Sequence, residues 1–211
     1  MKEQVLQILN HPDLSIFGKP DAMCDQILAF LAEWKKWSSK IDLTSEDDEP
    51  SVLQKHVFDS LQYARALRRD GRTLDIGSGA GFPGIPLKIV CPEMHMVLVE
   101  SRRKRASFLK SVVRTLKLTH IEVVNCRIED LMQREEYAAR FDQVVFKAVA
   151  PLSQCLEWGF PFLRENGLIV IKKEPGDPAD GGPSLRLREK IPVRSLSGVV
   201  SDLLIFEKCS T

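Results

Sequence analysis

Apolar residues in the first third of the chain recur at the spacing of amphipathic helices. The pattern predicts a helix after Pro20, with an apolar face formed by Met23, Ile27, Phe30, Leu31 and Trp34. The polar residues 38–50 end this helix, and their acidic run Glu46–Glu49 is typical of a solvated loop leading into a helix N-terminus. A second helix is predicted from about Ser51, and we expect Gly71 to close it.

From residue 72 onward, short apolar runs alternate with helical stretches. The runs predict strands at Thr73–Ile76, Met96–Glu100, Ile121–Asn125, Phe141–Phe146 and Leu168–Ile171. The helices between and after them are predicted at Gly84–Val90, Arg102–Leu116, Ile128–Ala139 and Leu152–Leu163. Such alternation predicts an α/β fold, with a mostly parallel sheet that helices cover on both faces.

The last part of the chain has a different pattern. A Pro/Gly-rich segment, residues 174–183, is followed by two strand candidates, Ile191–Leu196 and Leu203–Glu207, with only a short connection around Gly198. Two strands without a helix between them predict an antiparallel hairpin at the end of the sheet. We therefore expect an N-terminal helical extension, residues 1–70, packed on an α/β domain of residues 71–211.

Composition narrows the classes of partner. The 211 residues carry 30 basic and 29 acidic side chains, so a nucleic-acid partner would need a local basic patch. The sequence has no apolar run near the roughly 20 residues of a membrane span, and Met1–Asn10 lacks the apolar block of a secretory signal. Five scattered cysteines form no C-x-x-C pair. We expect a cytoplasmic protein, without a metal site and monomeric.

The strongest chemical signal is the turn that follows the first predicted strand. Asp75-Ile-Gly-Ser-Gly-Ala-Gly81 leaves that strand and enters a helix, where glycines allow a sharp turn and close approach of the backbone to a ligand. Amides at the helix start could face a carboxylate. Glu100 ends the second strand, where a carboxylate can accept hydrogen bonds from both ribose hydroxyls of an adenosine. Together these features predict binding of S-adenosylmethionine.

A second interpretation fits the same glycines. Gly79, Gly81 and Gly84 satisfy G-x-G-x-x-G, the fingerprint of dinucleotide binding, which would predict a nicotinamide-dependent oxidoreductase. Asp75 counts against it, because that position is usually apolar in dinucleotide binders. The terminal hairpin also leaves no room for a separate substrate domain, and none of the four histidines marks a proton-transfer site.

Longer motifs carry a family resemblance. The segment Leu74-Asp-Ile-Gly-Ser-Gly-Ala-Gly-Phe-Pro-Gly-Ile-Pro-Leu87 resembles the glycine motif of the bacterial guanine-N7 methyltransferases of small-subunit (16S) ribosomal RNA, the glucose-inhibited division protein B family. Its Phe-Pro-Gly-Ile-Pro tail is much more specific than its glycines. Downstream, Glu100-Ser-x-x-Lys-Arg-x-x-Phe-Leu109, Arg127-Ile-Glu129 and Lys147-Ala-Val-Ala150 are similar to further motifs of this family.

Upstream motifs extend the resemblance over most of the chain. Trp34 with Ile41-Asp-Leu-Thr-Ser45, and His56-Val-Phe-Asp-Ser60, are similar to the family's W…N-L-T-S and H-x-x-D-S stretches. Three positions depart from the family pattern: Asp42 where Asn is usual, Lys147 where Arg is usual, and Glu174 where Gly is usual. Arginine and lysine are not interchangeable where a planar fork is needed, so these departures bear mainly on the acceptor nucleotide.

The resemblance implies a Rossmann-like class I methyltransferase fold with a seven-stranded sheet, S-adenosylmethionine as cofactor, and ribosomal RNA or a small-subunit precursor as partner. With the turn residues included, the expected cofactor contacts are Asp75, Gly77, Gly79, Phe82, Glu100, Ile128, Glu129 and Lys147. Guanine N7 has a free lone pair and no proton to lose, so the reaction needs positioning rather than a base. We expect Lys147 and Arg127 to act at the reacting groups.

Basic residues supply candidates for RNA binding. Arg103, Lys110 and Arg114 recur on one face of a predicted helix, and Lys173 follows a predicted strand. Such a stripe is also typical of a solvated helix face. His56 and Asp59 fit a buried polar pair or cap, and the resemblance favours the acceptor side of the pocket for both. A small-molecule methyltransferase and a catalytically silent RNA-binding relative remain alternatives.

Overall fold

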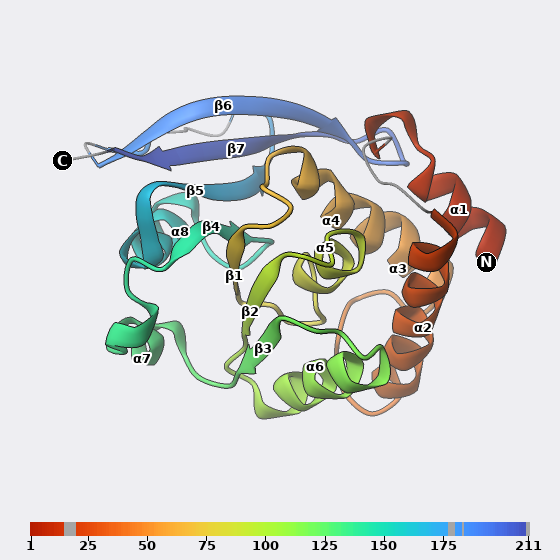
Figure 1. Cartoon of the computed structure of the whole chain (residues 1–211). Helices are drawn as coiled ribbons and strands as arrows, with labels where there is room; N and C mark the ends of the chain where they lie inside the picture. The colour runs from red at the N-terminus through yellow and green to blue at the C-terminus, as the bar shows by residue number, and fades with distance from the viewer. Residues whose placement is uncertain (15–19, 177–179, 183, 210–211) are drawn as a thin grey trace.

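One seven-stranded sheet forms the centre of the molecule (Figure 1). The computed structural model describes residues 1–14, 20–176, 180–182 and 184–209, so part of the Pro/Gly-rich segment predicted at 174–183 lies outside the described residues. The strand order is β3-β2-β1-β4-β5-β7-β6. The bounds are β1 Arg72–Ile76, β2 His95–Val99, β3 Ile121–Val124, β4 Phe141–Phe146, β5 Leu163–Lys173, β6 Leu185–Arg194 and β7 Val200–Lys208.

The direction of the strands confirms the predicted architecture. Strands β1 to β5 pair in parallel, whereas β7 is antiparallel to both β5 and β6. Parallel strands place their carboxyl ends at one edge of the sheet, and in open α/β sheets ligands bind at that edge, beside the strand where the order reverses. Here β1 is that strand, because the chain first adds β2 and β3 on one side of it and then β4 on the other.

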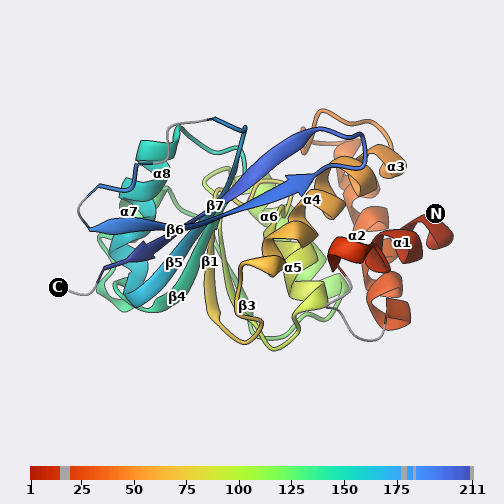
Figure 2. The same ribbon diagram turned by 90° about the horizontal axis from the view of Figure 1, so that it is seen from above.

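Helices cover both faces of the sheet (Figure 2). Outside the stretch between α2 and β1, the α-helices are α1 Lys2–Leu9, α2 Pro20–Ser38, α5 Gly84–Val90, α6 Arg103–Thr115, α7 Ile128–Met132 and α8 Leu152–Gly159. A helical stretch between α2 and β1 consists of α3 Glu49–Val52, the π turn η2 Leu53–Val57, α4 Phe58–Gln62 and the 3₁₀ turn η3 Tyr63–Arg65. The remaining 3₁₀ turns are η1 Pro12–Leu14, η4 Glu135–Tyr137 and η5 Phe160–Phe162. None of the described helices combines the length and apolar character that a membrane span requires.

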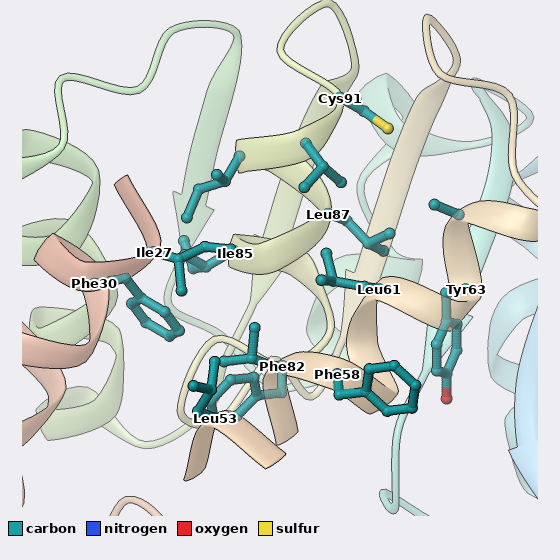
Figure 3. Packing of buried hydrophobic residues seen from close by; sticks show 14 of the residues in the cluster. Ile27, Phe30, Leu53, Phe58, Leu61, Tyr63, Phe82, Ile85, Leu87 and Cys91 are labelled. Carbon is teal, nitrogen blue, oxygen red and sulfur yellow. The ribbon is translucent and has the colours of Figure 1, made fainter. Parts of the chain in front are cut away.

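The N-terminal helices and the sheet share one hydrophobic cluster (Figure 3). Ile27 and Phe30 of α2 and Phe58 of α4 are fully buried, and they belong to the same cluster as Ile85 and Leu87 of α5. A second cluster lies between the other face of the sheet and α7 with α8. The expected extension, residues 1–70, is therefore packed on the sheet through a common core.

Several predicted boundaries were wrong, for tertiary reasons. The helix predicted to reach Leu163 ends at Gly159, and β5 begins at Leu163 rather than at Leu168 because Leu163 pairs with Phe141 of β4. The second N-terminal helix ends at Arg65 rather than at Gly71, because the buried amide of Gln143 on β4 bonds both the N–H and the carbonyl of Arg68. The helix predicted to reach Ala139 ends at Met132, and Ala139 N–H instead donates to the carbonyl of Pro161. The hairpin strands are longer than predicted, because β6 and β7 pair over nearly their whole length.

Candidate functional site

The glycine-rich turn leaves β1 and folds over the end of β2. The N–H groups of Gly77 and Ser78 both donate to the carbonyl of Val99, at 2.9 and 3.0 Å. Gly77, Gly79 and Gly81 all have positive φ angles, which L side chains rarely adopt. At Gly77 a Cβ would also come within 2.8 Å of Val149, which follows β4. The turn therefore lies closely against the loop after β4 with its amides along the carboxyl edge of the sheet.

Asp75 lies beneath this turn, with no exposed surface. Its Oδ2 accepts the Gly84 N–H at 3.0 Å, at the start of α5. Its Oδ1 is buried and has no hydrogen-bond partner among the described residues. Burial raises the pKa of this carboxyl to about 7, although the Gly84 N–H acts in the opposite direction. Asp75 thus holds the turn against α5 from inside the protein.

Glu100 links the turn to the end of β2. Its Oε2 accepts the Gly79 N–H at 2.9 Å and its Oε1 accepts the Arg102 N–H at 2.6 Å. The side chain is only 5% exposed, so both amides hold it in one orientation. Each carboxylate oxygen can accept more than one hydrogen bond. The carboxylate can therefore still receive the two hydroxyls of a ribose.

A cavity of about 150 Å³ opens beside Glu100. Its walls combine apolar side chains with a few polar groups, and they consist of Ile76, Gly77, Val99, Glu100, Ser101, Cys126, Arg127, Ile128, Glu129, Val149 and Trp158. The Arg127 side chain is 77% exposed, and its Nε lies 3.6 Å from Glu129 Oε2. A small, mostly apolar cleft with a few placed polar groups is typical of a ligand site. Its position next to the Glu100 carboxylate, which has capacity to accept from ribose hydroxyls, suits an adenine ring.

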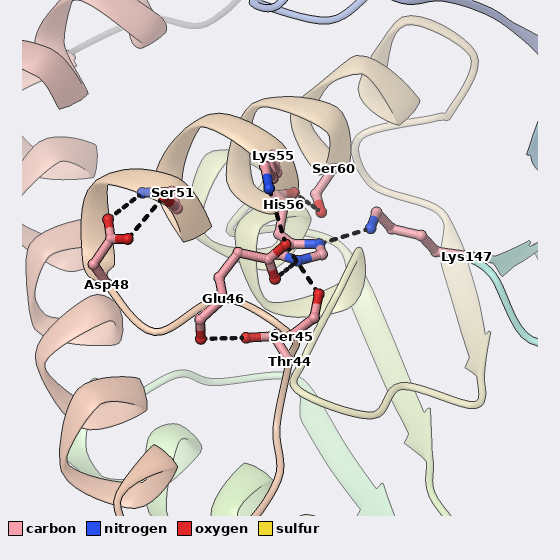
Figure 4. A network of polar contacts seen from close by, with 9 residues as sticks. All are labelled: Thr44, Ser45, Glu46, Asp48, Ser51, Lys55, His56, Ser60 and Lys147. Atoms are coloured by element: carbon pink, nitrogen blue, oxygen red, sulfur yellow. Dashed lines mark hydrogen bonds and ion pairs between the residues drawn. The ribbon is translucent and has the colours of Figure 1, made fainter.

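Lys147, at the end of β4, points toward the N-terminal helices (Figure 4). Its Nζ lies 3.0 Å from His56 Nδ1, and the opposite ring nitrogen, Nε2, lies 2.5 Å from Glu46 Oε2. The His56 ring stacks on Phe82, with centroids 5.0 Å apart and planes at 22°. The Lys147 Nζ lies 5.9 Å from the centroid of the same Phe82 ring. Phe82 and Lys147 therefore meet each other, but neither lines the 150 Å³ cavity.

A second polar chain lies alongside. Asp59 Oδ2 pairs with Lys172 Nζ at 2.5 Å, and both side chains are less than one-fifth exposed. The hydroxyl of the buried Tyr63 donates to the Phe146 carbonyl at 2.8 Å and accepts the Lys172 N–H at 3.2 Å. These contacts tie α4 and η3 to the carboxyl ends of β4 and β5. Asp59 and His56 are thus not a pair, because each has its own partners.

The predicted basic residues lie in separate places. Arg103, Lys110 and Arg114 are exposed on α6, whose opposite face is buried. The start of α6 also borders an open cavity of about 550 Å³, lined by Ser38, Ser39, Lys40, Ile41, Asp42, Arg102, Arg103, Lys104 and Arg105. The Arg105 guanidinium donates to the Asp42 carbonyl at 3.0 and 2.9 Å, a backbone contact that Asn would supply equally well. Lys173 donates to the Ala150 carbonyl at 3.4 Å, away from α6.

Sequence patterns missed two residues of these networks. Glu46 was expected in a solvated loop, but its side chain is 7% exposed and bonded to His56. The same acidic run was interpreted correctly at Asp48, which caps α3 by accepting the Ser51 N–H at 2.8 Å. Lys172 gave no signal, and it lies just beyond the strand predicted at Leu168–Ile171. Local sequence carried no sign of either contact, because each partner is distant along the chain.

The acidic and histidine side chains of this region serve hydrogen bonding. Within the described part of the chain, no three His, Cys, Asp or Glu side chains are grouped so that they could hold a metal ion. Glu46, His56, Asp59 and Glu100, and the Oδ2 atom of Asp75, are instead bonded to backbone amides or to other side chains.

Comparison with known proteins gives a consistent result. Residues 23–177 match the family model described as rRNA small subunit methyltransferase G. Relatives that carry the name "Ribosomal RNA small subunit methyltransferase G" include those from Alkaliphilus oremlandii (38% identity, 74% of this chain, 66% of the relative), Syntrophotalea carbinolica (38%, 85% and 81%) and a Geobacter species (43%, 72% and 69%). This chain thus spans about two thirds to four fifths of their lengths.

Solved structures agree on the fold. A point mutant of MtNAS in complex with S-adenosylmethionine matches with a TM-score of 0.61 at 17% identity, covering 100% of this chain and 84% of that one. TYW2 from M. jannaschii in complex with AdoMet matches with a TM-score of 0.60 at 16% identity, covering 81% and 78%. At such identities the likeness concerns the fold alone, and that fold is the Rossmann-like one predicted from the sequence.

Proposed function

The chain belongs to the rRNA small subunit methyltransferase G family, and from that premise we propose that it methylates N7 of a guanine in small-subunit (16S) ribosomal RNA. The observation that carries the proposal is the carboxylate of Glu100, held by the Gly79 and Arg102 amides at the edge of a cavity of adenine size. Family membership also sets aside the nicotinamide alternative that the spacing of Gly79, Gly81 and Gly84 had left open.

The residues of the turn fit S-adenosylmethionine. Glu100 would hold the ribose, Ile128 and Glu129 would border the adenine, and the amides near Gly77 and Gly79 would face the methionyl carboxylate. Asp75 would act from beneath, through the Gly84 amide that it bonds, because its side chain is fully buried. The cofactor supplies an electrophilic methyl group when it is bound.

The chain's own task is to position the acceptor. N7 of guanine offers a lone pair and releases no proton on methylation, so alignment supplies the rate enhancement and no general base is needed. Lys147 and Arg127 would contact the acceptor nucleotide. The major-groove edge of guanine carries only acceptors, N7 and O6, and cationic donors suit that edge.

Basic residues of α6 would bind the RNA backbone. The cavity at the start of α6 has five cationic side chains, against one carboxylate, and within the described residues Lys40, Arg102, Arg103 and Lys104 form no ion pair. Arg102 also touches Glu100 through its N–H, so the cavity adjoins the expected ribose position. Lys110 and Arg114 continue the charge along the helix, and Lys173 would reach RNA on the other side. Phosphates are bound by such local patches even when the net charge is near zero.

Methyl transfer to RNA tests this function. The purified chain would be incubated with S-adenosylmethionine that carries a labelled methyl group, together with small-subunit RNA and a small-molecule extract of cells. We expect label at one guanine, with cleavage chemistry specific for N7-methylguanosine locating it. Label in a small metabolite and none in RNA would favour the small-molecule alternative. Cofactor binding without any transfer would identify a silent RNA-binding relative.

A further inference from the structure

Three side chains form a continuous hydrogen-bonded row from the loop after α2 to the end of β4. Glu46, His56 and Lys147 stand in that order, with separations of 2.5 Å and 3.0 Å (Figure 4). Glu46 is 7% exposed and His56 is 20% exposed, so water competes little for either contact. The row joins residues that are 101 positions apart at its two ends, and its middle ring is stacked on Phe82 of the glycine motif.

The partners of His56 decide which ring nitrogen bears hydrogen. A carboxylate can only accept, so the Glu46 contact requires hydrogen on Nε2. An ammonium can only donate, so the Lys147 contact requires a free lone pair on Nδ1. Both conditions are met by one species, the neutral imidazole with its hydrogen on Nε2. The row therefore fixes the tautomer of His56, in the way that a second partner commonly fixes a histidine.

The charges around His56 favour this neutral form. Burial lowers the pKa of His56, the Lys147 ammonium lowers it further, and Glu46 and Asp59 oppose both. Burial alone would raise the pKa of Glu46, but the hydrogen bonds from His56 and Ser45 outweigh it and hold that pKa below its usual value. Lys55 lies on the other side of Glu46, at 3.5 Å. Burial lowers the pKa of Lys147 and Lys172 acts in the same direction, whereas Asp59 and Glu46 oppose this and favour the ammonium. Around neutral pH, Glu46 is therefore ionised and His56 is neutral.

We propose that Glu46 and His56 are positioning residues that hold the Lys147 ammonium as a fixed hydrogen-bond donor to the acceptor guanine. One ammonium hydrogen is taken by His56 Nδ1, which leaves two for the substrate. A donor held there suits O6, the acceptor beside N7, and disfavours adenine, which presents an amino group at the corresponding position.

The row also explains how this chain uses Lys at a position where the family usually has Arg. An ammonium lacks the geometry of a guanidinium fork and needs a partner that sets its direction. The role rests on the proposed function.

Nitrogen NMR on the intact wild-type chain tests the row without any activity. With ¹⁵N-labelled histidine, His56 should show the Nε2–H tautomer and a titration midpoint below about 6.5, the usual value. Glu46→Gln removes an anion that raises the pKa of His56, so the titration midpoint should fall below that of wild type, while the Lys147 ammonium keeps Nδ1 free of hydrogen. A wild-type spectrum with hydrogen on Nδ1 at neutral pH would overturn the proposal, whatever the enzyme methylates.

Kinetics test the consequence for catalysis. His56→Phe keeps a ring on Phe82 but removes the acceptor, and kcat for RNA should fall about tenfold or more because Lys147 loses its alignment. His56→Asn places an amide oxygen near the Nδ1 position, so kcat should stay within about threefold of wild type. Wild-type kcat should fall at acid pH as His56 protonates and can no longer accept from Lys147, and His56→Asn should abolish that fall.

Matched measurements separate this role from a structural one. His95→Asn changes an exposed histidine at the start of β2, at the opposite edge of the sheet, and should leave rate and pH profile unchanged. Binding of S-adenosylhomocysteine should be equal in all four proteins, which shows that each is folded. Full activity in His56→Phe, or an acid fall that persists in His56→Asn, would sink the proposal. Absence of any RNA methylation by wild type would instead contradict the proposed function.

Discussion

Gly79 and Glu100 meet across the ends of β1 and β2, with the glycine N–H 2.9 Å from Oε2 of the carboxylate. The two residues are 21 positions apart, so the contact exists only because β1 and β2 pair in parallel and in register, with Ile76 opposite Val99. It joins the two parts of the sequence signal, the glycine turn and the strand-terminal acid, into one site. A change at either residue should therefore disturb cofactor binding through the other.

Replacing Glu100 tests that coupling. Glu100→Gln keeps the size of the side chain, but its single oxygen cannot serve both the Gly79 and the Arg102 amides and also a ribose. Affinity for S-adenosylhomocysteine, measured by calorimetry, should fall about tenfold or more. Glu93→Gln, at an exposed position before β2, is the control and should bind like wild type. Equal affinities in both variants would refute the ribose assignment.

Gly77 should be intolerant of any side chain. An alanine there would combine a φ of +76° with a methyl group 2.8 Å from Val149. Gly176→Ala is a matched control, because its φ is +91° but no atom of the described residues lies within 4 Å of the added carbon. Gly77→Ala should weaken S-adenosylhomocysteine binding about tenfold or more, while Gly176→Ala should leave it unchanged. A cofactor affinity of wild-type strength in Gly77→Ala would show that the turn does not approach the ligand.

Asp75 should make stability fall with rising pH. Burial raises its folded pKa to about 7, above the unfolded value of about 3.9, so the folded state binds the extra proton between these values. Its contribution to stability is thus present below about pH 4 and is lost as the pH rises through about 7.

Urea unfolding across that pH range measures the effect. We compare the free energy of unfolding of Asp75→Asn with that of wild type at about pH 4 and at about pH 8. The difference, variant minus wild type, should rise by about 1 kcal/mol or more between these pH values, because the amide cannot ionise. Asp70→Asn, at an exposed carboxylate, should follow the wild-type curve in parallel. A constant difference between Asp75→Asn and wild type would exclude a raised pKa.

The α6 stripe should contribute to RNA affinity through charge. Reversing Arg103, Lys110 and Arg114 to Glu should weaken RNA binding and flatten its dependence on salt. The reason is that a protein with fewer phosphate contacts releases fewer counterions when it binds. S-adenosylhomocysteine binding should not change. A triple reversal at Arg140, Lys190 and Arg194, which are exposed and lie away from α6, controls for net charge. Equal losses in the two triple variants would show that the stripe has no specific role.

Much of the fold followed from local pattern. Every strand of the predicted sheet exists. The signals of a strand are an apolar run or an alternation of buried and exposed positions, and both depend only on residues that are neighbours in the sequence. Helix ends were less predictable. Arg65 rather than Gly71 ends the second helical stretch because Gln143, on a strand far along the chain, takes the backbone groups of Arg68.

The sequence by itself determined the sheet, the glycine turn and the acid at Glu100, since each depends on the order of residues within one βα unit. Only the tertiary structure decided that Glu46 is buried and bonded to His56, that Lys147 turns toward His56, and that Lys172 pairs with Asp59. The physical reason is that burial and hydrogen bonding of a polar side chain depend on groups brought near by the fold, and those groups lie on separate elements with no fixed spacing along the chain.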